Sequence, residues 1–422
     1  LALAAAALWF TSCSSEDVAS GTNQGKMSSL TLTINTGKSM GSRATDWTTT
    51  DPAGNENDIN RITVGIFSAD GNTLRTIVEL ASGTGTDNTF KPETNGASTT
   101  IVTNSLTDGD LIKVAVNAPK GHFVGIKTAN DFMNKSEEAK DALLTKADDS
   151  KETTKEACNN NVPMYGEGTL TPKNSGDNSV FKAVSGGADK VTVKHMLAKV
   201  TLESLKVDFK AGSAYANAEF TPVAAFLINV PDKMDFTTAV WNSSAALLHG
   251  WSAYDTSDAT NCTFSYAAGN TGGSGTYAQY LTTEGLTSAT ALSGTATSTA
   301  KAWFYTLPNN RVDDGAAVTN NTKLVIAGKF TENKSATSPK TEMVYYSLPI
   351  NATYKASSHK YEKPTGGDGS VFQVCPNQNY KCSVVIRTKG SSTPNTNLTP
   401  QEAEIKVEVT NFVDVSQDAE FN

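Results

Sequence analysis

The chain has 422 residues, a formal net charge of −8 and only 18% charged residues, and much of its polar surface comes from Ser, Thr, Asn and Gly. This length is enough for two or three domains, and the composition favours strands and turns over helical bundles. Nucleic acid is excluded as a partner, because phosphate binding needs a basic face.

The amino terminus resembles a bacterial lipoprotein signal. Residues 1–10, "LALAAAALWF", form an apolar run that is too short to remain as a membrane-spanning helix. Small residues follow, and "FTSC" places Cys13 where a lipobox has its acylated cysteine. We predict a signal peptide over 1–13 with lipid on Cys13; a plain secretory signal with an incidental cysteine is the alternative. Residues 14–27 are small and polar, as in a flexible tether.

The first predicted strand lies just after this tether. Leu30, Leu32 and Ile34 alternate with threonines, which is typical of a strand with one buried face. The next segment, 35–58, is loop-like and contains Arg43 followed by Ala44. Its "GKS" lacks the first glycine of a phosphate-binding loop, since Leu32 stands there, so no cofactor is predicted.

Further elements of the first half follow in order. An Asp-Gly turn joins two strands within 59–80, and 111–119 forms another strand that ends at a proline. The charged stretch 131–157 is predicted to be helical, and 161–168 to be a turn-rich return. The segment 190–209 is strand-like with a break near Lys194, and it could join two sandwiches.

The second half repeats the all-β pattern, and 254–300 is predicted to form long surface loops with weak strands. Many short strands separated by turn signals favour β-sandwiches. The strand candidates are 222–230, 301–308, 322–330, 341–350, 380–388 and 402–409.

Catalytic and metal-binding patterns give no enzyme prediction. The match to SxxK at Ser298 and Lys301 lacks its helix and partner motifs, and no Cys/His cluster suggests zinc. Cys375 and Cys382 flank a short turn, where they form either a hairpin disulfide or two buried thiols. The histidines lie far apart in sequence, at His122, His195, His249 and His359.

The last predicted strand resembles the first. Its apolar face continues less cleanly beyond Asn411, where we expect a bulge. It is either an ordinary sandwich strand or a segment that replaces the first strand of a neighbouring subunit by strand addition. The face comprises Ala403, Ile405, Val407, Val409, Val413 and Val415.

Taken in order, several weak motifs resemble the fimbrillins, the type V pilus subunits of Gram-negative anaerobes. The likeness covers nearly the whole chain: the lipoprotein-like start at Cys13, the strand that runs into Arg43-Ala44, "INRITVGIFSADG", "VAVNAP", "VPMYGEG", "KHMLAKVTL", "NQNYKCSVVIRTKG" and "AEIKVEVTNF". Two departures are "NQNY", where Arg-Asn-His-Tyr is more usual, and Phe412, where Trp is common.

The resemblance implies an all-β fold of two transthyretin-like β-sandwich domains with long loops and a short helix in the first. It implies a propeptide at 14–43 that holds a removable first strand, an N-terminal domain at 44–193 and a C-terminal domain at 194–422 that ends in a donor strand. An arginine-specific, trypsin-like protease would cut after Arg43.

The implied function is that of a structural shaft subunit of a cell-surface fimbria, whose precursor is anchored by lipid in the outer membrane. Its implied partners are other copies of itself, minor tip and anchor subunits, and the maturing protease. The alternative is a tip or anchor adhesin, or a glycan-binding surface lipoprotein. No catalytic residue, cofactor or metal is expected.

Overall fold

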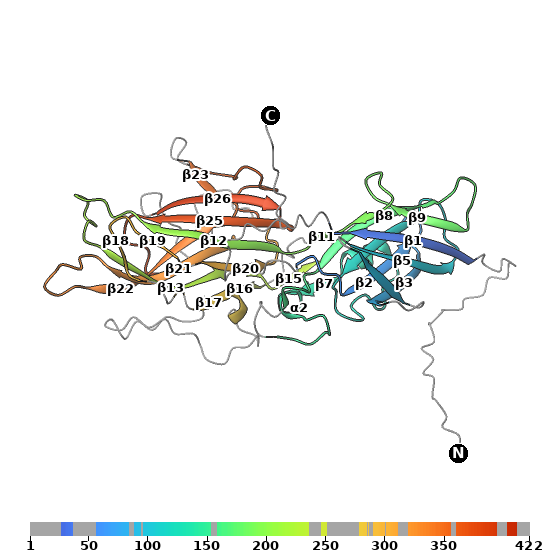
Figure 1. The fold of residues 1–422 in the computed structure, drawn as a ribbon, viewed down its shortest axis with the longest axis horizontal. Coiled ribbons are helices and arrows are strands. Elements are labelled where there is room, and N and C mark those ends of the chain that lie inside the picture. The colour runs from blue at the N-terminus through green and yellow to red at the C-terminus, as the bar shows by residue number, and fades with distance from the viewer. Residues whose placement is uncertain are drawn as a thin grey trace, which may run out of the picture.

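The computed structural model shows a β-rich chain whose sheets form two adjoining parts (Figure 1). The prediction of a mostly β fold is therefore confirmed. The structure describes residues 27–36, 56–83, 88–93, 96–152, 158–235, 246–250, 278–284, 286, 290–299, 301–310, 320–355, 360–394 and 403–411.

The first part is a ten-stranded sheet that closes on itself. Its strand order is β10-β1-β5-β4-β3-β2-β6-β8-β11, and β9 pairs with both β1 and β8, which completes a barrel-like ring. The strands are β1 (Met27–Asn35), β2 (Arg61–Phe67), β3 (Leu74–Ser82), β4 (Thr89–Glu93), β5 (Gly96–Asn104), β6 (Leu111–Val116), β8 (Met164–Pro172), β9 (Val180–Val184), β10 (Val191–Thr192) and β11 (Lys194–His195).

The ring encloses one apolar core and carries a second on its outside. Alternate residues of β1, β2 and β6 meet inside, with Leu32, Val64 and Val114 all fully buried. On the outside, Phe123 stacks on Phe132 of α1 (Ala129–Met133) with ring centroids 3.9 Å apart. The predicted hairpin over 59–80 is confirmed as β2 and β3.

The prediction of one helical stretch over 131–157 is wrong. The chain forms α1, then the short strand β7 (Ser136–Glu138), then α2 (Ala139–Leu144). The helix is interrupted because β7 pairs with β15 (Lys233–Asp235), a partner far along the chain that local propensity does not reveal. The turn-rich return predicted at 161–168 is also wrong beyond residue 163, since β8 begins at Met164 and pairs with β6.

The segment 190–209 passes from one part to the other, with the predicted break near Lys194. β10 and β11 pair with the ring, whereas β12 (Ala198–Val207) pairs with β25 and β20 of the second part. The apolar core of the second part includes α2, so the two parts share packed side chains as well as backbone.

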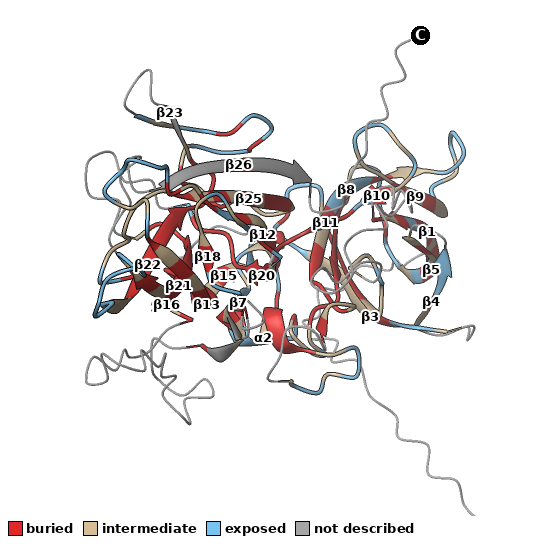
Figure 2. Ribbon diagram, turned by 60° about the vertical axis from the view of Figure 1, so that its left-hand side comes forward, coloured by how far each residue is buried: buried red, intermediate tan, exposed pale blue. Residues whose placement is uncertain are grey.

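The second part consists of two five-stranded sheets around a shared core, and all six strands predicted there are confirmed (Figures 1 and 2). The first sheet holds β12, β19 (Thr297–Ser298), β20 (Ala302–Thr306), β25 (Gln378–Ile386) and β26 (Ala403–Asn411). The second holds β13 (Glu219–Ile228), β17 (Thr282–Glu284), β18 (Leu292–Ser293), β21 (Lys323–Thr331) and β22 (Thr341–Pro349). Small two-stranded pairs are β14 (Val230–Pro231) with β16 (Leu247–Leu248), and β23 (Thr353–Lys355) with β24 (Lys360–Glu362).

Candidate functional site

The first strand is the element that closes the ring. β1 pairs antiparallel with β5 along its whole length, from Met27 opposite Asn104 to Asn35 opposite Gly96. On its other side it runs parallel to β9 and then to β10, where Ile34 faces Val191. Removing β1 would therefore break the ring between β5 and the pair β9 and β10 and would leave backbone groups on both sides without partners.

The inward side chains of β1 belong to the core of the ring. Leu30 and Leu32 are fully buried and Ile34 is 2% exposed, whereas Met27 and Thr33 point outward. The polar residues Ser28 and Thr36 lie buried at the two ends of this apolar row. Without β1, the site would be an elongated apolar groove with room for three large side chains and a small polar residue at each end.

Glycines allow the strands around this groove to approach closely. A β-carbon built on Gly96 of β5 would lie 1.9 Å from the carbonyl oxygen of Ile34, far inside van der Waals contact. A β-carbon on Gly168 of β8 would lie 2.4 Å from the carbonyl oxygen of Val184 in β9. Any larger residue at these two positions would push apart the strands that hold β1.

The second strand singled out by the sequence lies in the other part of the molecule. β26 pairs antiparallel with β25 and ends the strand order of its sheet, so it is an edge strand (Figure 1). Val407 is 4% exposed and faces the fully buried Cys382. Ala403, Ile405 and Val409 take alternate positions on the same strand, as predicted. The structure thus keeps β1 and β26 in separate sheets.

Several predicted site residues lie outside the described residues. These are Cys13, Arg43, Ala44, Val413 and Val415, together with His359. Their roles stay predictions. The described chain ends at residue 36 and resumes at residue 56, so the segment with Arg43 connects β1 to the turn before β2.

The remaining sequence candidates occupy separate places. His122 lies 3.1 Å from Glu137, His195 contacts Asn377, and His249 accepts a hydrogen bond from the backbone of Asn229. Ser298 lies in the two-residue strand β19 rather than on a helix. Within the described residues, no group of His, Cys, Asp or Glu could hold a metal ion. No helix among them is long and apolar enough to cross a membrane.

The cysteines behave as buried thiols. Cys158, Cys375 and Cys382 are all buried, and no disulfide joins the last two. Burial raises the pKa of Cys375 to about 11 and that of Cys382 to about 12, which keeps both thiols protonated and unreactive.

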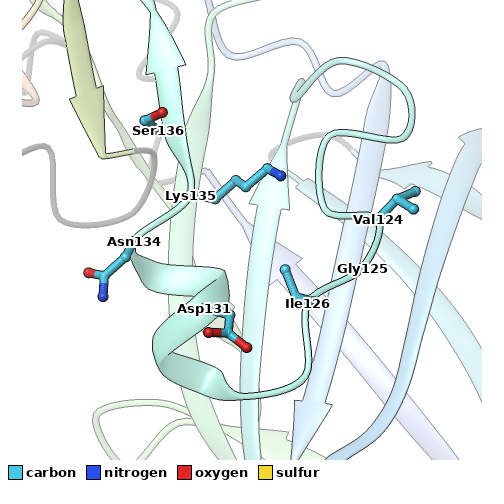
Figure 3. A pocket seen from close by; sticks show the side chains of 7 residues that line it. All are labelled: Val124, Gly125, Ile126, Asp131, Asn134, Lys135 and Ser136. Atoms are coloured by element: carbon cyan, nitrogen blue, oxygen red, sulfur yellow. The ribbon is translucent and has the colours of Figure 1, made fainter.

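A shallow hollow beside α1 is the other surface feature of note (Figure 3). Its only carboxylate, Asp131, accepts hydrogen bonds from the backbone of Lys127 and Thr128 at the start of the helix and is therefore already engaged. It is lined by Val124, Gly125, Ile126, Asp131, Asn134, Lys135 and Ser136. Because its carboxylate is engaged at the start of the helix, this hollow offers less than the β1 groove as a functional site.

Sequence analysis missed the strands that hold β1. β5 alternates weakly, and only Ala97 and Ile101 of its inward residues are apolar and buried. β9 and β10 are short and pair with β1 in parallel, which requires partners distant in sequence. The alternation around Ile101 is the one local signal that could have revealed β5.

Comparison with known proteins agrees with this architecture. Residues 28–203 match the family model described as major fimbrial subunit protein (FimA). A crystal structure of a fimbrilin from Porphyromonas gingivalis W83 is similar, with a TM-score of 0.55 and 16% identity over 93% of this chain and 99% of that chain. A cell adhesion protein from Parabacteroides distasonis shares the fold, with a TM-score of 0.56 and 16% identity over 92% of this chain and 100% of that chain. One from Bacteroides eggerthii has a TM-score of 0.55 and 17% identity over 93% of this chain and 98% of that chain. No curated protein sequence matches the chain.

These findings show a β-rich chain that shares the fold of the fimbrilin and cell-adhesion structures and whose residues 28–203 match the major fimbrial subunit family model. The resemblance to the fimbrillin family is confirmed: the matched segment begins within β1 and extends into β12, and so includes every strand of the ring. The proteins of this family are structural subunits of fimbriae and not enzymes.

Proposed function

We propose that this chain is the shaft subunit of a cell-surface fimbria, and that subunits join by exchanging the strand that closes the ring. The observation that carries the proposal is the position of β1, which fills an apolar groove between β5 and the pair β9 and β10. A strand held this way can be replaced by another with the same alternation. Backbone hydrogen bonds form with any strand, and the buried face requires only apolar side chains at alternate positions.

Maturation would begin with attachment of lipid to the precursor and end with its proteolytic cleavage. Lipid on Cys13 would anchor the precursor in the outer membrane, and an arginine-specific, trypsin-like protease would cut between Arg43 and Ala44. Support comes from the position of that bond in the sequence, between the end of β1 and the start of β2. A cut there separates β1 from the rest of the ring without touching any other described strand.

The donor would be β26 of a neighbouring copy, with the segment 403–415 as its full extent. The apolar residues of the two strands match if the donor runs in the direction of β1. Ala403 then takes the place of Ser28, Ile405 of Leu30, Val407 of Leu32, Val409 of Ile34 and Asn411 of Thr36. In this register a small residue, three large apolar residues and a polar residue of β26 take the places of similar residues in and just after β1. This match supports the assignment.

The division into two transthyretin-like domains, 44–193 and 194–422, is part of the same proposal. It is supported by the change of partners at this point of the chain, since β10 and β11 pair with the ring and β12 with the second part. The filament would add further subunits through the same strand, with minor tip and anchor subunits at its ends.

Four measurements test the proposal. Fatty-acid labelling of the precursor should disappear in Cys13→Ala, and subunits isolated from filaments should begin at Ala44. Ile405→Asp should leave a folded, cleaved monomer that does not polymerise, because an unpaired charge would have to enter an apolar groove. A peptide of residues 403–415 should bind cleaved monomer and stop growth. Normal filaments from Ile405→Asp would refute the donor assignment, and filament subunits that still begin at Cys13 would refute the cut.

A further inference from the structure

A buried polar cluster ties the turn before β2 to the second part of the molecule. Glu56 stands in that turn, and its carboxylate oxygen lies 3.2 Å from the ammonium of Lys199 in β12. The hydroxyl of Tyr305 in β20 donates to the same oxygen at 2.5 Å. The Lys199 side chain is 3% exposed and that of Glu56 13%, so the ion pair is largely shielded from water and salt.

The backbone of Glu56 is held as well. The Nε2 atom of His195 lies 2.9 Å from the carbonyl oxygen of Glu56, and the Nδ1 atom lies 3.4 Å from the side chain of Asn377. Burial lowers the pKa of His195 to about 4, so the ring is neutral at pH 7 and Nε2 carries the proton that it donates. Glu56 is thus fixed by three side chains from β11, β12 and β20.

The place of this cluster in the chain suggests its role. Glu56 is the first described residue after the segment that contains Arg43, and β2 begins at Arg61. Among the described residues, other hydrogen bonds of this turn reach the first part; for example, the amide of Asn60 donates to Asn117 at 2.9 Å. The Glu56 cluster reaches across to the second part, at the point where β11 passes into β12.

We propose that Glu56, Lys199, Tyr305 and His195 form a latch that ties down the new amino-terminal end once β1 has been removed. The inference rests on the proposed cut after Arg43, because that cut converts an internal segment into a free end. Free ends fray unless they are fixed, and fraying here would run directly into β2. The latch keeps β2 in the ring while the groove is open, so that only β1 is lost.

The test compares hydrogen exchange before and after cleavage. The full chain is cut with an arginine-specific protease, the product is identified by mass, and exchange is followed in the peptide 56–64. We expect the cut to leave exchange in this peptide unchanged in the wild type. In Glu56→Gln the cut should accelerate it about 100-fold, because the weakened cluster no longer fixes the end that the cut has freed. Tyr305→Phe, which removes only a hydroxyl, should give a smaller acceleration in the same peptide.

Glu93→Gln is the matched control, since Glu93 forms an exposed pair with Lys91 at 3.5 Å and should change nothing. Wild-type protection in cleaved Glu56→Gln would overturn the latch. Loss of protection already in the uncut variants would also overturn it, because the cluster would then hold the whole fold rather than the cut end. Filament assembly by the wild type is scored separately, so failure of strand exchange is distinguishable from failure of the latch.

Discussion

Shortening one inward side chain of β1 should loosen the strand, whereas shortening its outward neighbour should not. Leu32 is fully buried in the core of the ring, and Thr33 beside it is exposed. We therefore compare Leu32→Ala with Thr33→Ala. The two changes lie next to each other and differ in the face of the strand that they alter.

The magnitude follows from the burial of β1. Its three large inward side chains contribute roughly 1.5–3 kcal/mol each, and net ladder hydrogen bonds add about 1 kcal/mol each at most. Truncating a buried leucine to alanine costs roughly 2–5 kcal/mol, and every 1.4 kcal/mol corresponds to about a factor of ten. Leu32→Ala should therefore release the cut strand roughly 30-fold faster or more, and Thr33→Ala at nearly the wild-type rate.

Two assays measure this difference. Urea unfolding of the uncut chain should show a lower midpoint for Leu32→Ala at an unchanged slope. After cleavage by an arginine-specific protease, chromatography at timed intervals should show how fast the amino-terminal fragment leaves. Equal release rates for Leu32→Ala and Thr33→Ala would refute the claim that the apolar face holds β1 in the ring.

Three further predictions concern other parts of the chain. Gly96→Ala should lower the thermal unfolding midpoint and speed release of β1, because the added methyl group would collide with the carbonyl oxygen of Ile34; an unchanged midpoint would contradict the close approach. Burial raises the pKa of Glu137 to about 8, so the folded state holds a proton that the unfolded state loses near pH 4.5. Stability contributed by this group should fall as the pH rises from about 4.5 to 8, and chemical denaturation of Glu137→Gln should lack this decline. Cys375 and Cys382 should react with a thiol reagent only on unfolding, and a reducing agent should leave the native mobility unchanged.

Local patterns in the sequence were sufficient for several of the longer strands. The alternation of Leu30, Leu32 and Ile34 predicts β1 and its buried face, and the Asp-Gly turn predicts the hairpin of β2 and β3. The alternation over 403–409 likewise predicts β26. These predictions succeed because the side-chain period of a strand and the backbone demands of a tight turn are properties of a few consecutive residues.

Tertiary structure alone decided what each strand does. β1 becomes the closing strand only because β5 and the short strands β9 and β10 reach it from distant parts of the sequence. The interrupted helix at 131–157 has the same cause, since β7 gains a partner in β15 that no local window contains. In the sequence Glu56 is an ordinary loop glutamate. Only the fold brings Lys199, Tyr305 and His195 into contact with it. A sequence read in short windows specifies which residues can pair, whereas the closed ring and the buried cluster depend on which strands the whole chain brings together.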